Sequence, residues 1–364
     1  MYITTTLFDR KEGFILQTTR IRIGAILLAA ILLFSLTACG GAGDNLSEIT
    51  DQTTTPTTAP TTAPPVRYEN LLTGEKELET TQNRPVAFMI GNYSYTSGYL
   101  QQEGIDKADF YVEAETEGGI PRIMAVFGSI EKVPAEVGPV RSARTHFVKM
   151  AKALDTIYCH VGGSTLGKAM IRQKGVTDLD GLTQVSSQLK AANGNWNEHI
   201  KVFPIAKINS AIKSRGIRTT TSTKSPYTFG SKAGDTKAEQ VQVAISSAYL
   251  SSFTYDATTG LYTKHRKALS TEVHKSVDGD PIQVKNVIIM YDKQFKEDAG
   301  HISYTLESGS GIYVSNGLSR QIRWSRTDSQ LSFKETDGTP LTVNPGKTYI
   351  CLTATGQAGK TVLQ

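Results

Sequence analysis

Acidic side chains recur at odd-numbered positions in one short stretch of the chain, and they are Asp109, Glu113, Glu115 and Glu117. Because successive side chains of a strand point to opposite faces, this spacing predicts that all four lie on one face. Carboxylates so close together repel one another, so a cationic partner is expected unless that face is solvated. Arginine suits this role, since its planar guanidinium pairs with a carboxylate through two hydrogen bonds. The nearest candidates are Arg122, Arg141 and Arg144.

Two of these arginines lie in a segment, GPVRSAR at 138–144, that leads directly into a predicted helix. In one hypothesis Arg141, Ser142 and Arg144 bind an anion together with the free backbone N–H groups at the helix start. In the other, the arginines neutralise the acidic strand across the fold. The sequence leaves both hypotheses open.

A second segment, CHVGGS at 159–164, ends a predicted strand before another predicted helix. Gly162 and Gly163 would let this loop approach a ligand closely, and Ser164 is suited to cap the helix. His160 is either a hydrogen-bonded core residue or a ligand contact. Cys159 and His160 point to opposite faces of the strand, so the sequence does not predict a Cys-His dyad.

Glu113 and Glu117 also define an alternative function, in which a hydrolase of wall glycan or peptide uses them as general acid and base with His160 assisting. An extended strand separates the two residues by roughly 13 Å, wider than the carboxyl pair of a glycosidase requires. The sequence contains no G-x-S-x-G, H-E-x-x-H or C-x-x-C motif, and its histidines lack zinc-ligand spacing. No metal and no cofactor are predicted.

Residues 1–38 have the pattern of an export signal. Arg20 and Arg22 precede an uncharged apolar run at 23–36, which is shorter than the roughly 20 residues of a membrane-spanning helix. The run ends in LTAC, which resembles the lipobox of bacterial lipoproteins, with Cys39 as its last residue. This resemblance implies that Cys39 is acylated and anchors the protein in the plasma membrane, on its outer face.

Residues 39–67 are rich in Thr, Pro and Ala and show no apolar periodicity. Such a composition cannot bury enough apolar surface to offset chain entropy, and proline favours extended conformations. The segment is therefore predicted to be a semi-stiff tether that holds a folded body away from the lipid.

Residues 68–225 alternate short apolar runs with helical patterns. Strands are predicted at 85–91, 109–114, 120–127 and 156–162, and helices at 141–154, 164–173 and 205–214. Residues 226–364 show strands separated by turn pairs such as Asn316-Gly317, with no helical periodicity. The predicted fold class is α+β: an α/β domain with a mixed sheet, followed by a smaller, mainly antiparallel β domain.

Charge and cysteine usage narrow the function classes further. The formal net charge of +5 is too weak a field to gather a nucleic acid, so no nucleic-acid partner is predicted. Cys159 and Cys351 lie in apolar runs that are typical of strand interiors, which favours buried free thiols. A disulfide between them is the alternative that an exported protein permits.

Several motifs are similar to those of the YerB-like lipoproteins, a family of paired domains of unknown function found mainly in Gram-positive bacteria. They are RPVA at 84–87, EGGIPR at 117–122, GPVRSAR at 138–144, HVGGS at 160–164, NVI at 286–288, GSG at 309–311, WSR at 324–326 and NPGKT at 344–348. The similarity spans roughly residues 68–355. It implies the fold, export and the location of the site, but no established reaction.

The function that these observations favour is a binding or accessory lipoprotein whose α/β domain holds an anionic or polar envelope ligand. The candidate ligand-binding residues are Arg122, Arg141, Ser142, Arg144, His160, Gly162, Gly163, Ser164, Glu113 and Glu117. In this hypothesis the arginines contact the ligand and the glutamates orient the arginines. A third hypothesis makes the chain a scaffold, with residues after 225 docking a cell-wall or envelope-protein partner.

Overall fold

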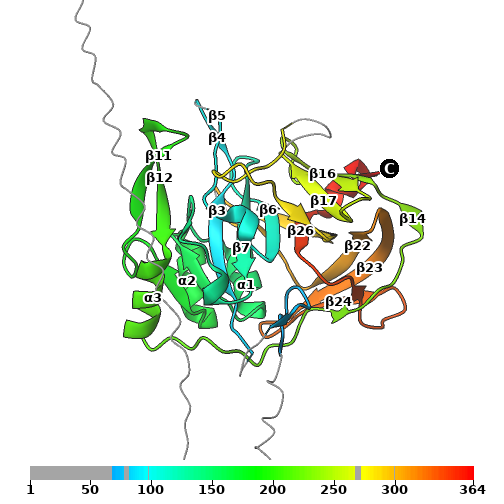
Figure 1. Cartoon of the computed structure of the whole chain (residues 1–364), viewed down its shortest axis with the longest axis horizontal. Coiled ribbons are helices and arrows are strands. Elements are labelled where there is room, and N and C mark those ends of the chain that lie inside the picture. The colour runs from blue at the N-terminus through cyan, green and yellow to red at the C-terminus, as the bar shows by residue number, and fades with distance from the viewer. Residues whose placement is uncertain (1–67, 78–81, 97, 267–271, 299) are drawn as a thin grey trace, which may run out of the picture. The chain divides into compact units, whose positions relative to one another are not determined.

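The strands before residue 225 form where the sequence is continuously apolar. A computed structural model describes residues 68–77, 82–96, 98–266, 272–298 and 300–364 (Figure 1). In this half the strands of the main sheet are β3 (Val86–Gly91), β6 (Phe110–Glu115), β7 (Pro121–Phe127), β9 (Ile157–His160) and β10 (Asp178–Asp180). Every residue of β3 and β7 is buried, as expected for strands that are covered on both faces.

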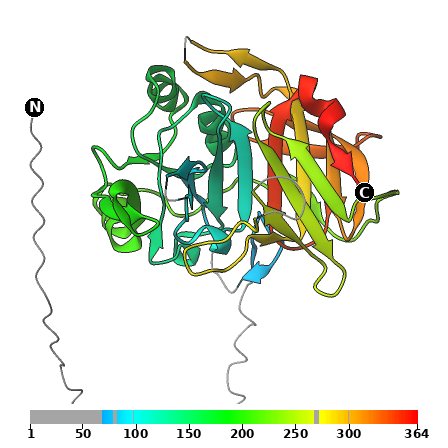
Figure 2. The ribbon, with the colours of Figure 1, turned by 90° about the horizontal axis from the view of Figure 1, so that it is seen from above.

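The strands after residue 225 continue the same sheet. They are β14 (Thr236–Lys237), β19 (Asn286–Asp292), β22 (Ser308–Ser315), β23 (Leu318–Arg326), β24 (Leu331–Glu335) and β26 (Thr348–Ala354). The order across the sheet is β10-β9-β3-β7-β6-β26-β19-β22-β23-β14, and β24 also pairs with β23. The two sequence halves meet in the middle, where β26 lies beside β6 (Figure 2).

Strand direction decides which loops gather at which edge. β3, β9 and β10 are mutually parallel, and β6, β26 and β19 are also parallel to one another. β7 runs antiparallel between β3 and β6, so these two strands point the same way. The carboxyl ends of all six strands therefore lie along one edge of the sheet, which we call the carboxyl edge.

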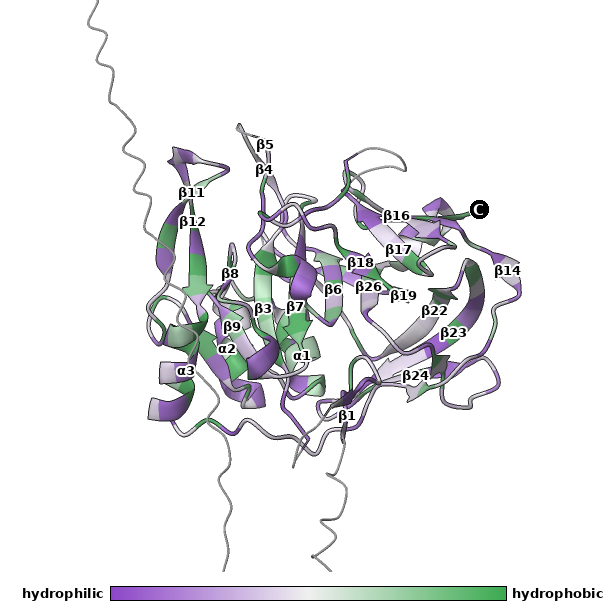
Figure 3. Cartoon of the chain, in the orientation of Figure 1, coloured by the Kyte–Doolittle hydropathy of each residue, from purple (hydrophilic) through white to green (hydrophobic). Residues whose placement is uncertain are grey.

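Alternating side chains build one core on each face of the sheet. Figure 3 shows the central strands β3 and β7 as largely hydrophobic. Phe88, Ile123 and Tyr349 belong to one buried cluster, and their neighbours Met89 and Met124 belong to the other. Helices α1 (Thr145–Ala153) and α2 (Thr165–Lys174) cover the face of Met89, since their buried residues join that cluster. Helix α3 (Ile205–Ser214) covers the opposite face.

A second sheet packs over the same face as α3. Its order is β18-β17-β16-β15-β27, with β15 (Gln240–Ala244), β16 (Leu250–Asp256), β17 (Leu261–His265), β18 (Gln283–Val284) and β27 (Val362–Leu363). Val241, Phe253 and Tyr262 of this sheet enter the Phe88 cluster. The central strands of the main sheet are thereby sealed from solvent.

Smaller elements complete the body. A three-stranded sheet has the order β11-β12-β8, with β8 (Glu136–Val137), β11 (Gln188–Ala192) and β12 (Asn195–Pro204). The two-stranded pairs are β1 (Tyr68–Glu69) with β2 (Lys76–Glu77), β4 (Ser94–Tyr95) with β5 (Gly98–Tyr99), β13 (Thr228–Phe229) with β25 (Thr342–Val343), and β20 (Gln294–Lys296) with β21 (Ile302–Tyr304). Short 3-10 helices span Ile105–Lys107, Ile130–Lys132 and Thr355–Lys360.

The predicted strands and helices before residue 225 are confirmed, with boundaries shifted by a few residues, and so is the α+β class. The hairpin at Asn316-Gly317 is confirmed as the two-residue turn between β22 and β23. Both described cysteines are free and buried, in agreement with the free-thiol prediction. The predicted signal at 1–38, Cys39 and the tether at 39–67 lie outside the described residues.

Candidate functional site

Glu117, Arg122 and Arg144 meet at the carboxyl edge. The guanidinium of Arg144 donates two hydrogen bonds to the Glu117 carboxylate, from Nε at 2.9 Å and from Nη2 at 2.5 Å. Arg122 donates from Nη2 to the same carboxylate and from Nη1 to the Ser142 carbonyl oxygen at 2.6 Å. Arg122 and Arg144 are 7% and 6% exposed. We call these three side chains the arginine fork.

Local backbone geometry explains why Glu117 reaches both arginines. Glu117 begins a tight turn that closes with a hydrogen bond from the Ile120 N–H to the Glu117 carbonyl oxygen. Gly118 and Gly119 follow with φ values of 67° and 75°, a left-handed conformation that glycine adopts without strain. The turn leads directly into β7, so Glu117 and Arg122 lie side by side.

Within the arginine fork, the charges of Glu117 and of the two arginines shift one another's pKa values. Burial alone would raise the pKa of Glu117, but the hydrogen bond from Arg144 and the charges of both arginines outweigh it and lower that pKa to about 2. Burial, together with the nearby charge of Arg144, lowers the pKa of Arg122 to about 10. At neutral pH the carboxylate is therefore ionised and the guanidinium of Arg122 is charged.

The prediction that the acidic side chains share one face is wrong for Glu113 and Glu117. Glu113 lies on the face of Tyr349, whose hydroxyl donates to its carboxylate at 3.0 Å. Glu117 pairs with Arg144 at the start of α1, whose helix covers the other face. Strand β6 ends at Glu115, and the turn that follows breaks the alternation on which the prediction depended. The two carboxylates therefore lie on opposite faces of the sheet.

Glu113 is instead the centre of a buried polar network. It is fully buried, accepts a hydrogen bond from Asn92 Nδ2 at 3.0 Å, and lies 3.5 Å from Nζ of Lys264. Burial lowers the pKa of Lys264, while the charge of Glu113 opposes this effect. Arg266 extends the network through hydrogen bonds to Asn92 and Gln102. Sequence reasoning missed these partners because they lie far along the chain and carry no local motif.

The remaining arginine of the segment at 138–144, which we call the basic segment, has a different environment. Arg141 is exposed, its guanidinium lies 4.9 Å from the centre of the Tyr93 ring, and Nη1 donates to the Tyr93 hydroxyl at 3.2 Å. Its backbone oxygen accepts from the Val161 N–H at 3.0 Å. Arg141 therefore stands apart from the fork but is fixed beside the end of β9.

The glycine loop after β9 is joined to the basic segment. The Ala143 N–H donates to the Gly162 carbonyl oxygen at 2.9 Å, and Ala143 and Gly163 form a parallel bridge. Ser164 caps α2 as expected, because its hydroxyl accepts from the Gly167 N–H at 3.0 Å. His160 is buried and hydrogen-bonded, with Nδ1 2.8 Å from the Gly162 oxygen and Nε2 3.2 Å from Asp178 Oδ2.

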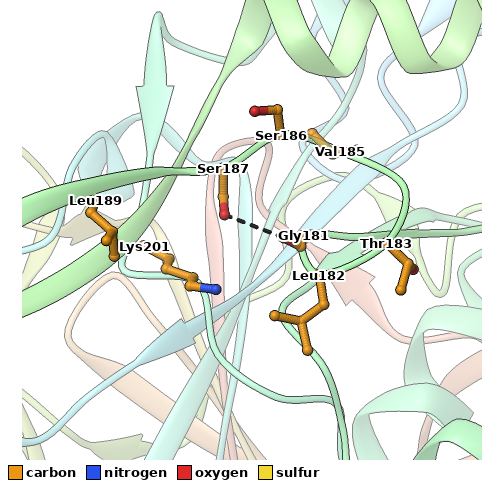
Figure 4. A pocket seen from close by; sticks show the side chains of 8 residues that line it. All are labelled: Gly181, Leu182, Thr183, Val185, Ser186, Ser187, Leu189 and Lys201. Carbon is orange, nitrogen blue, oxygen red and sulfur yellow. Dashed lines mark hydrogen bonds between the residues drawn. The ribbon is translucent and has the colours of Figure 1, made fainter.

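Two adjoining hollows open at this edge. One has a volume of about 360 Å³, and its lining includes the cations Lys168 and Arg172 and the carboxylates Asp178 and Asp180, together with His160, Gly162 and Leu182. The other has a volume of about 450 Å³ and is lined by Gly181, Leu182, Thr183, Val185, Ser186, Ser187, Leu189 and Lys201. The hollows share Leu182 and Thr183, and together we call them the carboxyl-edge groove. Figure 4 shows the Lys201 side chain directed from β12 toward the loop that begins at Gly181.

The cations of the groove have no acidic partner. Lys168 and Arg172 are exposed and Lys201 is partly exposed, and none of the three pairs with a carboxylate among the residues that the structure describes. Two carboxylates also line the groove and are bound by other groups: Asp180 accepts from the N–H groups of Gly162 and Leu182 at 2.8 and 3.0 Å, and Asp178 Oδ2 lies 3.2 Å from His160 Nε2. Sequence reasoning missed these cations because they lie on two elements that are distant in the sequence, α2 and β12.

Fold and site together define an α+β protein in which two sequence halves share one mixed sheet and a cationic groove opens at its carboxyl edge. The chain belongs to the family described as "Protein of unknown function (DUF3048)", whose N-terminal domain matches residues 72–218 and whose C-terminal domain matches residues 241–350.

Two comparisons agree with this assignment. The chain is 29% identical over 287 residues to the Bacillus subtilis protein named "Putative lipoprotein YerB", covering 77% of this chain and 84% of that protein. The crystal structure of the Bacillus subtilis YerB protein superposes with a TM-score of 0.69 at 25% identity, covering 80% of this chain and 98% of that one. Within the described part of the chain, no helix is both long and apolar enough to cross a membrane.

Proposed function

We propose that this protein is a surface-anchored binding lipoprotein of the bacterial envelope, and that the carboxyl-edge groove holds an anionic or polar ligand. The observation that carries the proposal is the set of unpaired cations Lys168, Arg172 and Lys201 around one groove. Cations that line a hollow without acidic partners attract negatively charged groups. Ligands of sheets with parallel strands also bind preferentially beyond the carboxyl ends of those strands.

This proposal changes the role of the arginine fork. The guanidinium groups of Arg122 and Arg144 are already hydrogen-bonded, to the Glu117 carboxylate and to backbone oxygens. They therefore support the groove instead of contacting the ligand. The fork holds the segment to which the Gly162 loop is hydrogen-bonded. Of the residues expected at the site, Gly162 and His160 line the groove, while Arg141 lies beside it.

The geometry does not favour the hydrolase alternative. A general acid must be protonated at working pH, and the pKa of Glu117 is about 2. Glu113 is fully buried, so a wall polymer has no access to it. No described feature singles out residues after 225 as a docking surface.

Binding is tested on the whole chain in non-ionic detergent, with Cys39→Ser to prevent acylation and inorganic polyphosphate as the probe. The variant Lys168→Met/Arg172→Met/Lys201→Met is expected to bind polyphosphate at least tenfold more weakly. The matched control is Lys207→Met/Lys213→Met/Lys360→Met, which removes three charges at exposed positions elsewhere. Equal affinities of the two triple variants overturn the proposal.

Anchoring is tested separately in cells. If Cys39 carries the lipid, radiolabelled palmitate is incorporated into the wild-type protein and not into the Cys39→Ser variant. If the body lies outside the membrane, protease added to intact cells degrades it. A labelled Cys39→Ser protein contradicts the assignment of Cys39, and a body that stays resistant until the cells are lysed contradicts the assigned face.

A further inference from the structure

The hairpin that carries Lys201 has an irregular tip. Asn193 and Gly194, with φ values of 49° and 81°, form its turn, and Ala192 pairs with Asn195. The next pair is Ala191 with His199, so residues 196–198 of β12 oppose no residue of β11. A bulge of this kind redirects side chains away from the regular alternation, and bulges are frequent near binding sites.

The bulge presents a tryptophan to solvent. Trp196 is 71% exposed, whereas Trp324, the other tryptophan of the chain, is 2% exposed. Leu189 on the same hairpin and Leu182 in the adjoining loop are 55% and 59% exposed. Leu182 and Leu189 line the same hollow, and Trp196 lies on the hairpin that carries Leu189. Exposed large apolar side chains of this kind mark a surface that can contact another molecule.

Polar residues suited to a sugar flank this tryptophan in the sequence. Asn197 is exposed beside it, and Asn195 is partly exposed, with its Oδ1 accepting from the Asn197 N–H at 3.1 Å. A tryptophan ring offers a flat apolar face, and side-chain amides both donate and accept hydrogen bonds. A sugar ring needs this combination, because it presents C–H groups on its faces and hydroxyl groups around its rim.

The distance between the tryptophan and the groove points to an extended ligand. Lys201 stands further along β12, five residues after Trp196 and beyond the bulge. The cations Lys168 and Arg172 line the hollow of about 360 Å³, which shares Leu182 with the hollow that Lys201 lines. A small anion cannot reach all of these groups, whereas a chain of linked units can lie across them.

We infer that the β11–β12 hairpin and the carboxyl-edge groove form one surface that binds an anionic glycan strand, an inference that rests on the proposed function and names its ligand class. Trp196 stacks on a sugar ring, Asn195 and Asn197 contact its hydroxyl groups, and Lys201, Lys168 and Arg172 bind the acidic groups further along the strand. The charge of the groove thus selects acidic polymers, while the tryptophan selects sugars among them.

The test titrates the Cys39→Ser whole chain, in detergent, with three polymers of matched length: hyaluronate as the anionic glycan, dextran as the neutral glycan and polyphosphate as the anion without sugar. Tryptophan fluorescence reports contact at Trp196. The variant Trp196→Phe retains only the buried Trp324 and is expected to give no signal change. Trp196→Ala is expected to weaken hyaluronate binding at least tenfold and polyphosphate binding less than twofold, whereas the matched control Phe295→Ala, at a side chain that is 38% exposed, changes neither.

The outcomes separate the inference from the proposed function. If polyphosphate binding needs the groove cations but Trp196→Ala binds hyaluronate normally, the glycan inference fails and the proposed function stands. If dextran binds as tightly as hyaluronate, the acidic selectivity is wrong and the inference fails. If the fluorescence of Trp196 responds to anionic lipid vesicles and not to hyaluronate, the ligand of this surface is the membrane and the glycan inference fails. If no polyanion binds, both proposals fail.

Discussion

The guanidinium of Arg144 donates two hydrogen bonds to the Glu117 carboxylate, from Nε to Oε2 at 2.9 Å and from Nη2 to Oε1 at 2.5 Å. This contact joins the turn before β7 to the start of α1, and Arg122 reinforces it from β7. The three candidate arginines therefore do not act as a group. Arg122 and Arg144 hold the carboxyl edge together, and Arg141 is exposed and lies over the Tyr93 ring.

Removing the charge of Glu117 should destabilise the fold and change its acid sensitivity. The folded pKa of about 2 lies below the unfolded value near 4.5, so the stabilisation is fully present above pH 4.5 and is lost as pH falls toward 2. Because the Glu117 side chain is 35% exposed, solvent screening reduces the contribution to about 1–2 kcal/mol. Urea unfolding of Glu117→Gln should show this loss at pH 7 and a smaller one near pH 2.5. The exposed control Glu239→Gln should unfold like the wild type, and a Glu117→Gln protein as stable as that control contradicts the fork.

His146 should make the protein sensitive to mild acid. It is fully buried in α1, neither ring nitrogen has a hydrogen-bond partner among the described residues, and burial with the charges of Arg122 and Arg144 lowers its pKa to about 3. The unfolded chain protonates this ring near pH 6.5, so stability is complete above that pH and falls as pH drops toward 3. His146→Leu should reduce the slope of unfolding free energy against pH, between pH 6 and 4.5, by about 1.4 kcal/mol per pH unit. An unchanged slope would show that the ring is not kept neutral in the folded state.

The buried pair of Glu113 and Lys264 should behave as a unit. Both side chains are fully buried, with Lys264 Nζ 3.5 Å from Glu113 Oε2. Lys264→Met leaves a buried carboxylate without its cation, which should cost about 3–5 kcal/mol of unfolding free energy. Glu113→Gln combined with Lys264→Met removes that uncompensated charge and should recover part of the loss. A double variant that loses the sum of the two single effects contradicts coupling between the residues.

Cys159 and Cys351 should react only when the protein unfolds. Both are fully buried and free, and burial raises the pKa of each thiol well above its usual range. In the Cys39→Ser chain, a thiol reagent should modify neither cysteine in buffer and both in 6 M guanidinium chloride, without prior reduction. Modification that requires reduction would reveal a disulfide.

Local patterns predicted much of the fold and less of the site. Strands such as β3 and β7 and the helix after Arg144 were predictable because their apolar residues repeat at strand or helix spacing. The sequence did not predict that Glu113 and Glu117 lie on opposite faces, because β6 ends between them and a glycine turn reorients the chain. Lys264, Lys168 and Lys201 escaped notice because only the folded chain brings them to Glu113 or to one groove.

Lysine footprinting on the unmodified groove tests the central claim most directly. The Cys39→Ser chain is acetylated briefly with and without polyphosphate, and the modification of each lysine is read by mass spectrometry. Polyphosphate should protect Lys168 and Lys201 several-fold relative to the exposed Lys207 and Lys360. Uniform protection of all four lysines, or protection confined to lysines outside the groove, contradicts the carboxyl-edge groove as the anion-binding surface.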